Sequence, residues 1–338
     1  MLYAIGAIGL ALSWRVHGCA DLYVRRYNQP VLICGNGKVE MIDGEQVRQL
    51  VLPQLPKRYR PISVAVSQSA LCVLARYTEP PTNEPYKSGT FSFGEEKEPP
   101  ERDGLLVITG GTAPRSVFIN IKGSNVALAA NYVFVENWQL NYAGRPLTDD
   151  NATLAKQGPV AAVALADFKR TELNDVVGVR GTPGASRVAM LRRNGSLELY
   201  RDLVPLQPIV IPTDMQIDWK RWDYASTSGE LATIVHSLGQ VAVSNGQHME
   251  VHVLPPAVPC VSATLLKIEP ASKNIWFTMF SGCFGQFQIA AITHTGSYLG
   301  KVTHRASILI RSFQPLSPVE VRFLQRLQKN QPFATRRL

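Results

Sequence analysis

Turn glycines recur at a nearly constant spacing in the second half of this chain. Gly195, Gly246 and Gly296 are 51 and 50 residues apart, and each follows a polar residue that suits a tight turn. Asn-Gly between alternating runs is the strongest short-range signal for a β-hairpin, because both central positions of that turn need a positive φ. A fixed period of about 50 residues, with several short strands in each repeat, predicts the blades of a β-propeller.

Each predicted repeat holds four short apolar or alternating runs with turn residues between them. The first set covers residues 160–168, 175–179, 187–191 and 196–200. The second covers 215–224, 229–236, 239–244 and 248–254, and the third covers 261–269, 274–280, 286–293 and 297–302. Four strands per unit is the composition of a propeller blade.

The N-terminal half follows this pattern less regularly. We expect the end of a first blade at 19–27, 31–34 and 38–42, and a second blade at 62–67, 71–76, 104–109 and 116–121. Runs at 125–130, 132–136 and 138–142 give a third blade without an identifiable fourth strand. We therefore predict an all-β propeller of about six blades over residues 1–316, or of seven if residues 1–14 and 306–313 do more than close the ring. With 45% apolar residues, the chain can bury such a core.

Residues 77–103 interrupt the second predicted blade. This segment holds five prolines, and its seven acidic residues outnumber its three basic residues. A segment of this composition buries too little apolar surface to fold alone. We predict an acidic, Pro-rich surface loop inserted into the propeller.

The C-terminal segment, residues 317–338, reads as a short helix followed by a basic tail. Ser317, Pro318 and Glu320 have the spacing of a capping box with proline in the first turn, so a helix is expected over 318–330. Its apolar side chains are spaced for one helix face, and basic side chains occupy the others. The helix either packs on its own propeller or anchors a partner.

Positive charge is concentrated at this end of the chain. The net charge is +9, and residues 259–338 hold ten basic and two acidic residues, so +8 of it lies there. This asymmetry predicts an acidic partner (RNA, DNA or an acidic protein surface), unless the tail only solubilises the chain. Within the tail, residues 317–338, only two residues are aromatic and could stack on single-stranded bases. The predicted partner-binding residues are Val319, Phe323, Leu324, Leu327, Arg322, Arg326, Lys329, Arg336 and Arg337.

The sequence predicts no catalytic, cofactor-binding or metal-binding residue. His248, Glu250 and His252 alternate along one strand, but same-face neighbours lie about 7 Å apart, which suits an exposed polar face better than one zinc ion. The five cysteines are odd in number and lack paired spacing, so we expect reduced thiols and an intracellular protein. The apolar residues 1–14 follow no basic segment and are too few to span a bilayer, so a buried strand is expected rather than a targeting segment.

Residues Val163 to Phe168, followed by Asp175 to Val179, resemble a propeller repeat of the FG-GAP family. Calcium-binding members carry several acidic residues in the intervening loop, whereas residues 169–174 of this chain include two basic ones, so the resemblance implies a degenerate repeat without metal. The overall spacing is also similar to that of WD-repeat propellers, although the Trp222-Asp223 dipeptide falls in an expected first strand.

Propellers of this kind occur in intracellular scaffold complexes, including ciliary trafficking coats. A propeller is a rigid disc with many exposed loops and edges that several partners can bind at once, so we expect a non-catalytic scaffold subunit of an intracellular multiprotein complex. The alternative is a propeller subunit that positions RNA or DNA for a partner enzyme through its basic C-terminal region. A third alternative, an enzyme or glycan-binding propeller, needs polar loop residues that converge around the axis.

Overall fold

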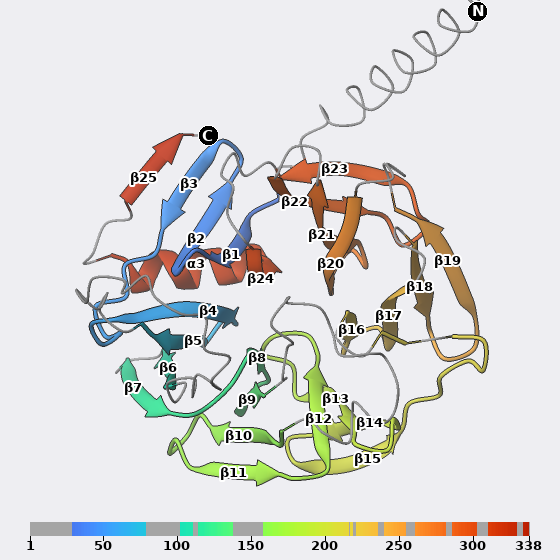
Figure 1. Cartoon of the computed structure of the whole chain (residues 1–338), viewed down its shortest axis with the longest axis horizontal. Coiled ribbons are helices and arrows are strands. Elements are labelled where there is room, and N and C mark those ends of the chain that lie inside the picture. Colours follow the sequence, from blue (N-terminus) through green and yellow to red (C-terminus); the bar gives the residue numbers. More distant parts are fainter. Residues whose placement is uncertain are drawn as a thin grey trace, which may run out of the picture.

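The chain folds into a six-bladed β-propeller (Figure 1). The structure is a computed structural model that describes residues 29–78, 102–110, 114–137, 158–215, 217–218, 221–235, 240–254, 261–281, 286–302, 310–329 and 334–337. Its strands form six antiparallel sheets, which we number as blades 1 to 6 around the ring. The described residues therefore contain six blades and not seven.

Each blade has its innermost strand near the axis and its outermost strand at the rim, and its strands are named in that order. Blade 1 contains β24 (Ile310–Pro315), β1 (Val31–Gly35), β2 (Lys38–Asp43), β3 (Gln46–Gln49) and β25 (Ala334–Arg337). Blade 2 contains β4 (Tyr59–Val66), β5 (Ala70–Tyr77), β6 (Asp103–Thr109) and β7 (Arg115–Asn120). Blade 3 contains β8 (Asn125–Leu128), β9 (Tyr132–Glu136), β10 (Val160–Ala164) and β11 (Arg170–Leu173).

The other three blades follow in chain order. Blade 4 contains β12 (Val176–Arg180), β13 (Arg187–Arg192), β14 (Leu197–Arg201) and β15 (Val204–Pro208). Blade 5 contains β16 (Trp222–Ala225), β17 (Glu230–Val235), β18 (Gln240–Ser244) and β19 (Met249–Val253). Blade 6 contains β20 (Val261–Ile268), β21 (Ile275–Ser281), β22 (Gln286–Ile292) and β23 (Tyr298–Val302).

Blade 1 closes the ring by combining strands from the two ends of the described chain. The late strand β24 pairs antiparallel with the early strand β1, with Pro315 opposite Val31. The closing strand thus begins at Ile310, inside the run expected at 306–313. A short strand that the sequence did not suggest, β25, adds a fifth strand by pairing with β3.

The core lies between the blades. Six apolar clusters are present among the described residues, one at each junction between neighbouring blades. Side chains alternate between the two faces of a strand. In β1, for example, Val31 and Ile33 pack toward blade 6, whereas Leu32 and Cys34 pack toward blade 2. Both faces of each sheet are therefore buried, which explains the dense apolar runs of the inner strands.

The predicted grouping of strands is correct for blades 2, 5 and 6 and wrong for the blade expected at 160–200. Val160–Ala164 does not begin that blade but is the third strand of blade 3, paired with β9 and β11. Blade 4 begins at Val176 and gains β15 as its outermost strand. β11 and β15 could not be recognised from an apolar pattern because both are outer strands. Every residue of β15 is exposed, and β11 is polar.

The turn glycines are also not all equivalent. Gly246 and Gly296 lie between the third and fourth strands of blades 5 and 6, whereas Gly195 lies between the second and third strands of blade 4. All three adopt positive φ, at 88°, 85° and 87° respectively. Each turn thus has the left-handed backbone that its glycine predicted. The 51 residues from Gly195 to Gly246, however, separate two non-equivalent turns and are not the length of one blade repeat.

Gly246 and Gly296 offer a matched test of how the turns stabilise the propeller. Alanine at either position must adopt the left-handed conformation, which costs about 1–2 kcal/mol. At Gly296 the new Cβ would also lie 2.8 Å from His252 Nδ1, whereas at Gly246 the nearest atom is 4.0 Å away. We expect Gly296→Ala to lower the free energy of unfolding more than Gly246→Ala in urea titrations. Equal losses would show that His252 moves aside without cost.

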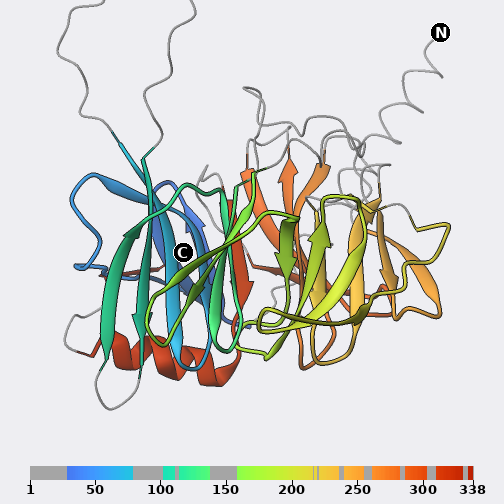
Figure 2. The same ribbon diagram turned by 90° about the horizontal axis from the view of Figure 1, so that it is seen from below.

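The one helix of the described residues, α3 (Pro318–Leu327), follows the closing strand and lies along one face of the disc (Figure 2). The Ser317 side chain caps the Glu320 amide, and the Glu320 side chain accepts the Ser317 amide, so the predicted capping box forms. The helix ends three residues before the predicted limit at 330, with Gln328 as its C-cap. The Gln328 side-chain amide exchanges two hydrogen bonds of 3.0 Å with the Val51 backbone, which ties this end of the helix to blade 1.

Several predictions concern residues outside the described part of the chain. These are the segment 1–14, the run 19–27, the run 138–142 and most of the Pro-rich loop, 79–101. The residues that flank the loop are described, and they hold Arg76 of β5 opposite Asp103 of β6. Within the described ranges, no helix is both long enough and apolar enough to cross a membrane.

Candidate functional site

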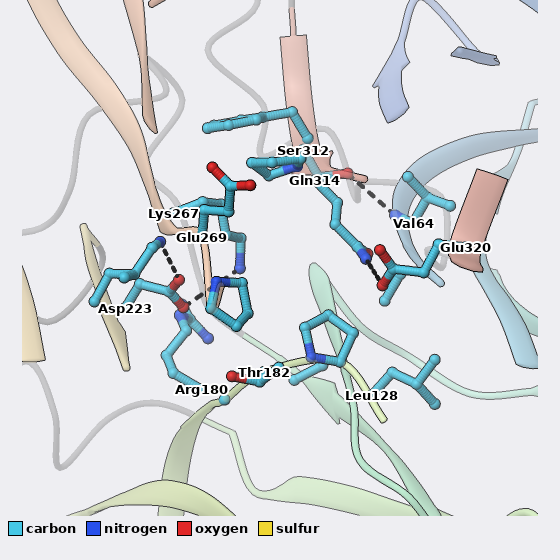
Figure 3. Close-up of a pocket in the computed structure, with 18 of the residues that line it drawn as sticks. Val64, Leu128, Arg180, Thr182, Asp223, Lys267, Glu269, Ser312, Gln314 and Glu320 are labelled. Atoms are coloured by element: carbon cyan, nitrogen blue, oxygen red, sulfur yellow. Dashed lines mark hydrogen bonds and ion pairs between the residues drawn. The ribbon is translucent and has the colours of Figure 1, made fainter. Parts of the chain in front are cut away.

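The innermost strands of all six blades surround a central cavity of about 220 Å³ (Figure 3). Residues from β4, β8, β12, β16, β20 and β24 contribute to its wall, together with the first turn of α3. The innermost strand of each blade is a sheet edge. The backbone amides on its unpaired side therefore need hydrogen-bond partners from outside the sheet. Polar side chains of neighbouring blades supply many of these partners and give the wall its chemistry.

The closing strand is fastened to blade 2 in this way. Ser312 Oγ accepts the Val64 amide at 3.0 Å, and Gln314 Oε1 accepts the Val66 amide at 2.9 Å. Gln314 Nε2 also donates to the Val66 carbonyl at 2.7 Å and to Glu320 Oε1 at 2.9 Å. One side chain therefore connects the ring closure, blade 2 and the start of α3.

A buried ion pair joins blade 3 to blade 4. Glu136 Oε1 contacts Arg180 Nη1, with 0% and 8% of the two side chains exposed. Glu136 Oε1 also accepts the Val179 amide at 2.6 Å, and its Oε2 accepts from Asn125 Nδ2 at 2.9 Å. Arg180 extends the connection to blade 5, because its Nε donates to the Trp222 carbonyl at 3.1 Å. Buried charges of this kind need such complete pairing.

Blade 5 is joined to blade 6 by Asp223. Its Oδ2 accepts the Ile268 amide at 2.8 Å, and its Oδ1 lies 3.6 Å from Lys267 Nζ. The Asp223 carboxylate is buried, whereas 33% of the Lys267 side chain is exposed. The carboxylate thus sits next to Lys267 on the cavity wall (Figure 3).

Two further carboxylates, Glu269 and Glu320, also belong to the wall. Glu269 accepts hydrogen bonds from Gln29 and, at 2.6 Å, from Ser272 Oγ. Burial raises the pKa of Glu320, although its hydrogen bonds with Ser317 and Gln314 oppose this effect. Both carboxylates are therefore committed to bonds within the protein.

The structure places the predicted partner-binding residues of α3 on two opposite sides. Phe323 and Leu324 are 2% and 0% exposed and pack into the cluster between blades 1 and 2. Leu327 is partly buried against the same cluster, and 39% of Val319 is exposed. Of the two alternatives for the helix, packing on its own propeller therefore describes Phe323, Leu324 and Leu327, whereas Val319 stays exposed.

The basic residues of α3 face solvent. Arg322, Arg326 and Lys329 are exposed, and among the described residues none of them forms an ion pair or side-chain hydrogen bond. Arg336 and Arg337 belong to β25, where they pair with Val47 and Gln46 of β3. The structure thus places Arg322 and Arg326 on the solvent face of α3 and Lys329 just beyond its end. The other two predicted residues lie on the outer edge of blade 1.

His248 precedes β19 and His252 lies within it, and the two do not form a metal site. His252 Nε2 lies 3.5 Å from Glu250 Oε2, and the histidine ring packs against Gly296 of blade 6. Within the ranges that the structure describes, no group of three histidine, cysteine or acidic side chains could hold a metal ion. Cys34 and Cys72 are buried free thiols, and burial raises the pKa of Cys34 to about 12, so neither has the properties of a nucleophile.

The sequence analysis did not identify Glu136, Arg180 and Asp223, the charged residues that join neighbouring blades near the central cavity. Glu136 and Arg180 each end a short apolar strand, and Asp223 follows a buried Trp. Glu136 ends the second strand of blade 3, and Arg180 ends the inner strand of blade 4. A charge at the last position of a strand is a weak signal, because strand ends are often exposed. The Trp222-Asp223 dipeptide does lie in a first strand, as expected.

Comparison with known proteins gives only distant structural likeness. No known protein family and no curated protein sequence matches the chain. Among solved structures, the WD40 β-propeller domain of Doa1 is similar, with a TM-score of 0.42, 8% identity, and 85% of each chain covered. The propeller resemblance seen in the sequence is confirmed at the level of fold by the six blades of the structure itself.

Two enzymes show a similar degree of likeness. Cobalt-substituted Synechocystis apocarotenoid oxygenase matches with a TM-score of 0.39 and 7% identity, over 81% of this chain and 71% of the enzyme. A prolyl endopeptidase matches with a TM-score of 0.40 and 13% identity, over 81% of this chain and 39% of the enzyme. Likeness at these identities and scores carries no argument about activity.

Proposed function

We propose that this protein is a non-catalytic scaffold subunit of an intracellular multiprotein complex, and that it docks an acidic protein surface on the exposed face of α3. The observation that supports the proposal is the contrast between the two sides of this helix. Phe323, Leu324 and Leu327 pack against the propeller core. The solvent side presents Arg322 and Arg326, and Lys329 is exposed just beyond the end of the helix. Exposed cations that are not paired within the protein attract an acidic surface over about 10 Å at 0.1 M salt.

An acidic protein suits this face better than single-stranded nucleic acid. Stacking on aromatic side chains supplies much of the affinity for single strands. Phe323 is the sole aromatic residue of α3, and it is 2% exposed. The helix therefore offers charge without a stacking surface.

The test is affinity capture from cell extract with the full chain, with and without nuclease, at low and physiological salt. The docking variant carries Arg322→Gln, Arg326→Gln and Lys329→Gln. The control variant carries Lys57→Gln, Lys122→Gln and Arg201→Gln, which removes the same charge from exposed residues of other elements. Exposed pairs contribute about 0.2–1 kcal/mol each, so we expect roughly tenfold weaker capture of protein partners by the docking variant at low salt.

The control variant should capture the same partners as the unmodified chain. Partners that disappear after nuclease treatment would instead favour the alternative function, in which the basic region binds RNA or DNA. Equal capture by both variants would show that the face of α3 is only a solvated surface.

A further inference from the structure

The outermost strand of blade 5, β19, has an open edge at the rim of the disc (Figure 1). Among the described residues, no strand pairs with its outer side. Val251 and Val253 of this strand are 48% and 57% exposed, so the edge is apolar as well as unpaired. An edge of this kind is a template on which another strand can pair.

The other five outer edges each carry a feature that discourages pairing. Blade 1 covers β3 with β25, and β15 contains Pro205 and Pro208, which lack backbone amides. The outer strands β7, β11 and β23 each include a lysine or an arginine, namely Arg115, Arg170 and Lys301. Within the described chain, β19 has no covering strand, no proline and no lysine or arginine. The pairing of β25 with β3 also shows that the outer edge of a blade in this propeller accepts an additional strand.

The hydrogen bonds of the β18–β19 hairpin determine which backbone groups of β19 point outward. The Asn245 amide donates to the His248 carbonyl at 3.3 Å across the turn, which makes these two residues a hydrogen-bonded pair. Such pairs alternate along antiparallel strands, so Glu250 and His252 direct their amides and carbonyls toward β18. The amides and carbonyls of the outer edge therefore belong to Met249, Val251 and Val253.

This edge is complementary to itself. When two copies of β19 run antiparallel with Val251 opposite Val251, Met249 of each copy lies opposite Val253 of the other. These are the residues whose amides and carbonyls point outward, so each pair can exchange two backbone hydrogen bonds. Glu250 lies opposite His252 and not opposite a second carboxylate, so no like charges meet. A shift of one residue would set outward groups opposite inward ones, and the hydrogen bonds would be lost.

We propose that two copies of this chain form a symmetric dimer by antiparallel pairing of their β19 edges, with the two-fold axis at Val251. A two-fold axis uses the same patch on both copies, so one strand that complements itself is sufficient. Only the five residues of β19 take part from each copy, against about 20–30 residues a side in a standard interface, so the dimer is weak and forms at high protein concentration. This inference is independent of the docking face on α3.

Sedimentation velocity on the full chain, over a wide range of protein concentration, measures this equilibrium. Val251→Lys places two lysines opposite each other at the axis, and like charges in direct opposition are unfavourable. The matched control is Val204→Lys on the proline-containing strand β15, where the valine is 63% exposed. We expect a monomer–dimer equilibrium that Val251→Lys weakens about tenfold or more and that Val204→Lys leaves unchanged.

The register also predicts a rescue. Val251→Glu should weaken the homodimer in the same way, but an equimolar mixture with Val251→Lys should form a heterodimer, because position 251 lies opposite itself across the axis. Val251 is half-exposed, so both variants should fold, which circular dichroism checks.

The unmodified chain gives a second measurement that does not depend on any variant. In amide hydrogen exchange, the amides of Met249, Val251 and Val253 should exchange more slowly as the protein concentration rises, whereas those of Glu250 and His252 should be protected at every concentration. A chain that stays monomeric, whether the edge then binds another protein or nothing, would overturn the proposal. So would equal effects of Val251→Lys and Val204→Lys, a mixture without heterodimer, or protection of the outward amides in the monomer, which would show that another segment of the same chain covers the edge.

Discussion

Glu136→Gln is expected to lower the free energy of unfolding by about 3–5 kcal/mol, because it leaves the buried Arg180 guanidinium without its counter-charge. The Glu136 side chain is fully buried, and it also accepts from Val179 and Asn125. Glutamine keeps one of the two acceptor oxygens and puts an NH2 donor in place of the other, so at least one of these donors is left without an acceptor. Urea unfolding followed by tryptophan fluorescence measures the loss. Removing one partner of a buried pair costs more than the pair contributes as a whole, so the effect should exceed that of an exposed pair.

The exposed pair formed by Arg170 and Glu172 on β11 provides the control. Their side chains are 45% and 38% exposed, so Glu172→Gln should change the stability by less than about 1 kcal/mol. The double variant Glu136→Leu/Arg180→Met removes both charges and should be more stable than Glu136→Leu alone. If Glu136→Gln costs no more than Glu172→Gln, the ion pair does not hold blades 3 and 4 together.

Phe323→Ala should destabilise the propeller by about 3–5 kcal/mol, the usual range for a large buried aromatic side chain. Phe323 packs between blades 1 and 2, next to the junction at which β24 closes the ring. The Phe323 ring also lies so near Gly110 that a Cβ there would meet it at 2.6 Å, so this side chain fills its site closely. The loss should therefore appear in the unfolding of the whole disc and not in the helix alone.

Arg322→Ala serves as the control on the same helix. Arg322 is exposed, and alanine is a slightly better helix former, so its change should stay within about 0.5 kcal/mol. A small loss for Phe323→Ala, or an unfolding transition in which only the helix signal changes, would mean that α3 is an appendage and does not support ring closure.

Local features of the fold could be predicted from the sequence because they depend on neighbours in the chain. The capping box of α3 requires only Ser317 and Glu320, which are three residues apart, and it forms as predicted. Gly195, Gly246 and Gly296 adopt positive φ because their turns demand it, whatever the rest of the fold does. Most inner strands could be recognised because both of their faces are buried, which requires continuous apolar runs.

The grouping of strands into blades could not be settled in the same way. Val160–Ala164 has the composition of an inner strand, but its pairing with β9 places it in the middle of blade 3. The outer strands β11 and β15 carry little or no apolar signal, since they face solvent. Without them, a count of four strands starting from Val160 runs across two blades.

The charged residues around the central cavity show most clearly which features follow from the sequence alone and which depend on the tertiary structure. The sequence by itself determined an all-β chain with short strands, glycine turns and a capped helix with one apolar side, because each of these follows from local backbone preference and burial. Only the tertiary structure decided that Glu136 meets Arg180, that Asp223 lies beside Lys267, and that the apolar side of α3 is used by the propeller. These contacts join different blades, and the partner of a charge buried at the axis depends on the closure of the whole ring.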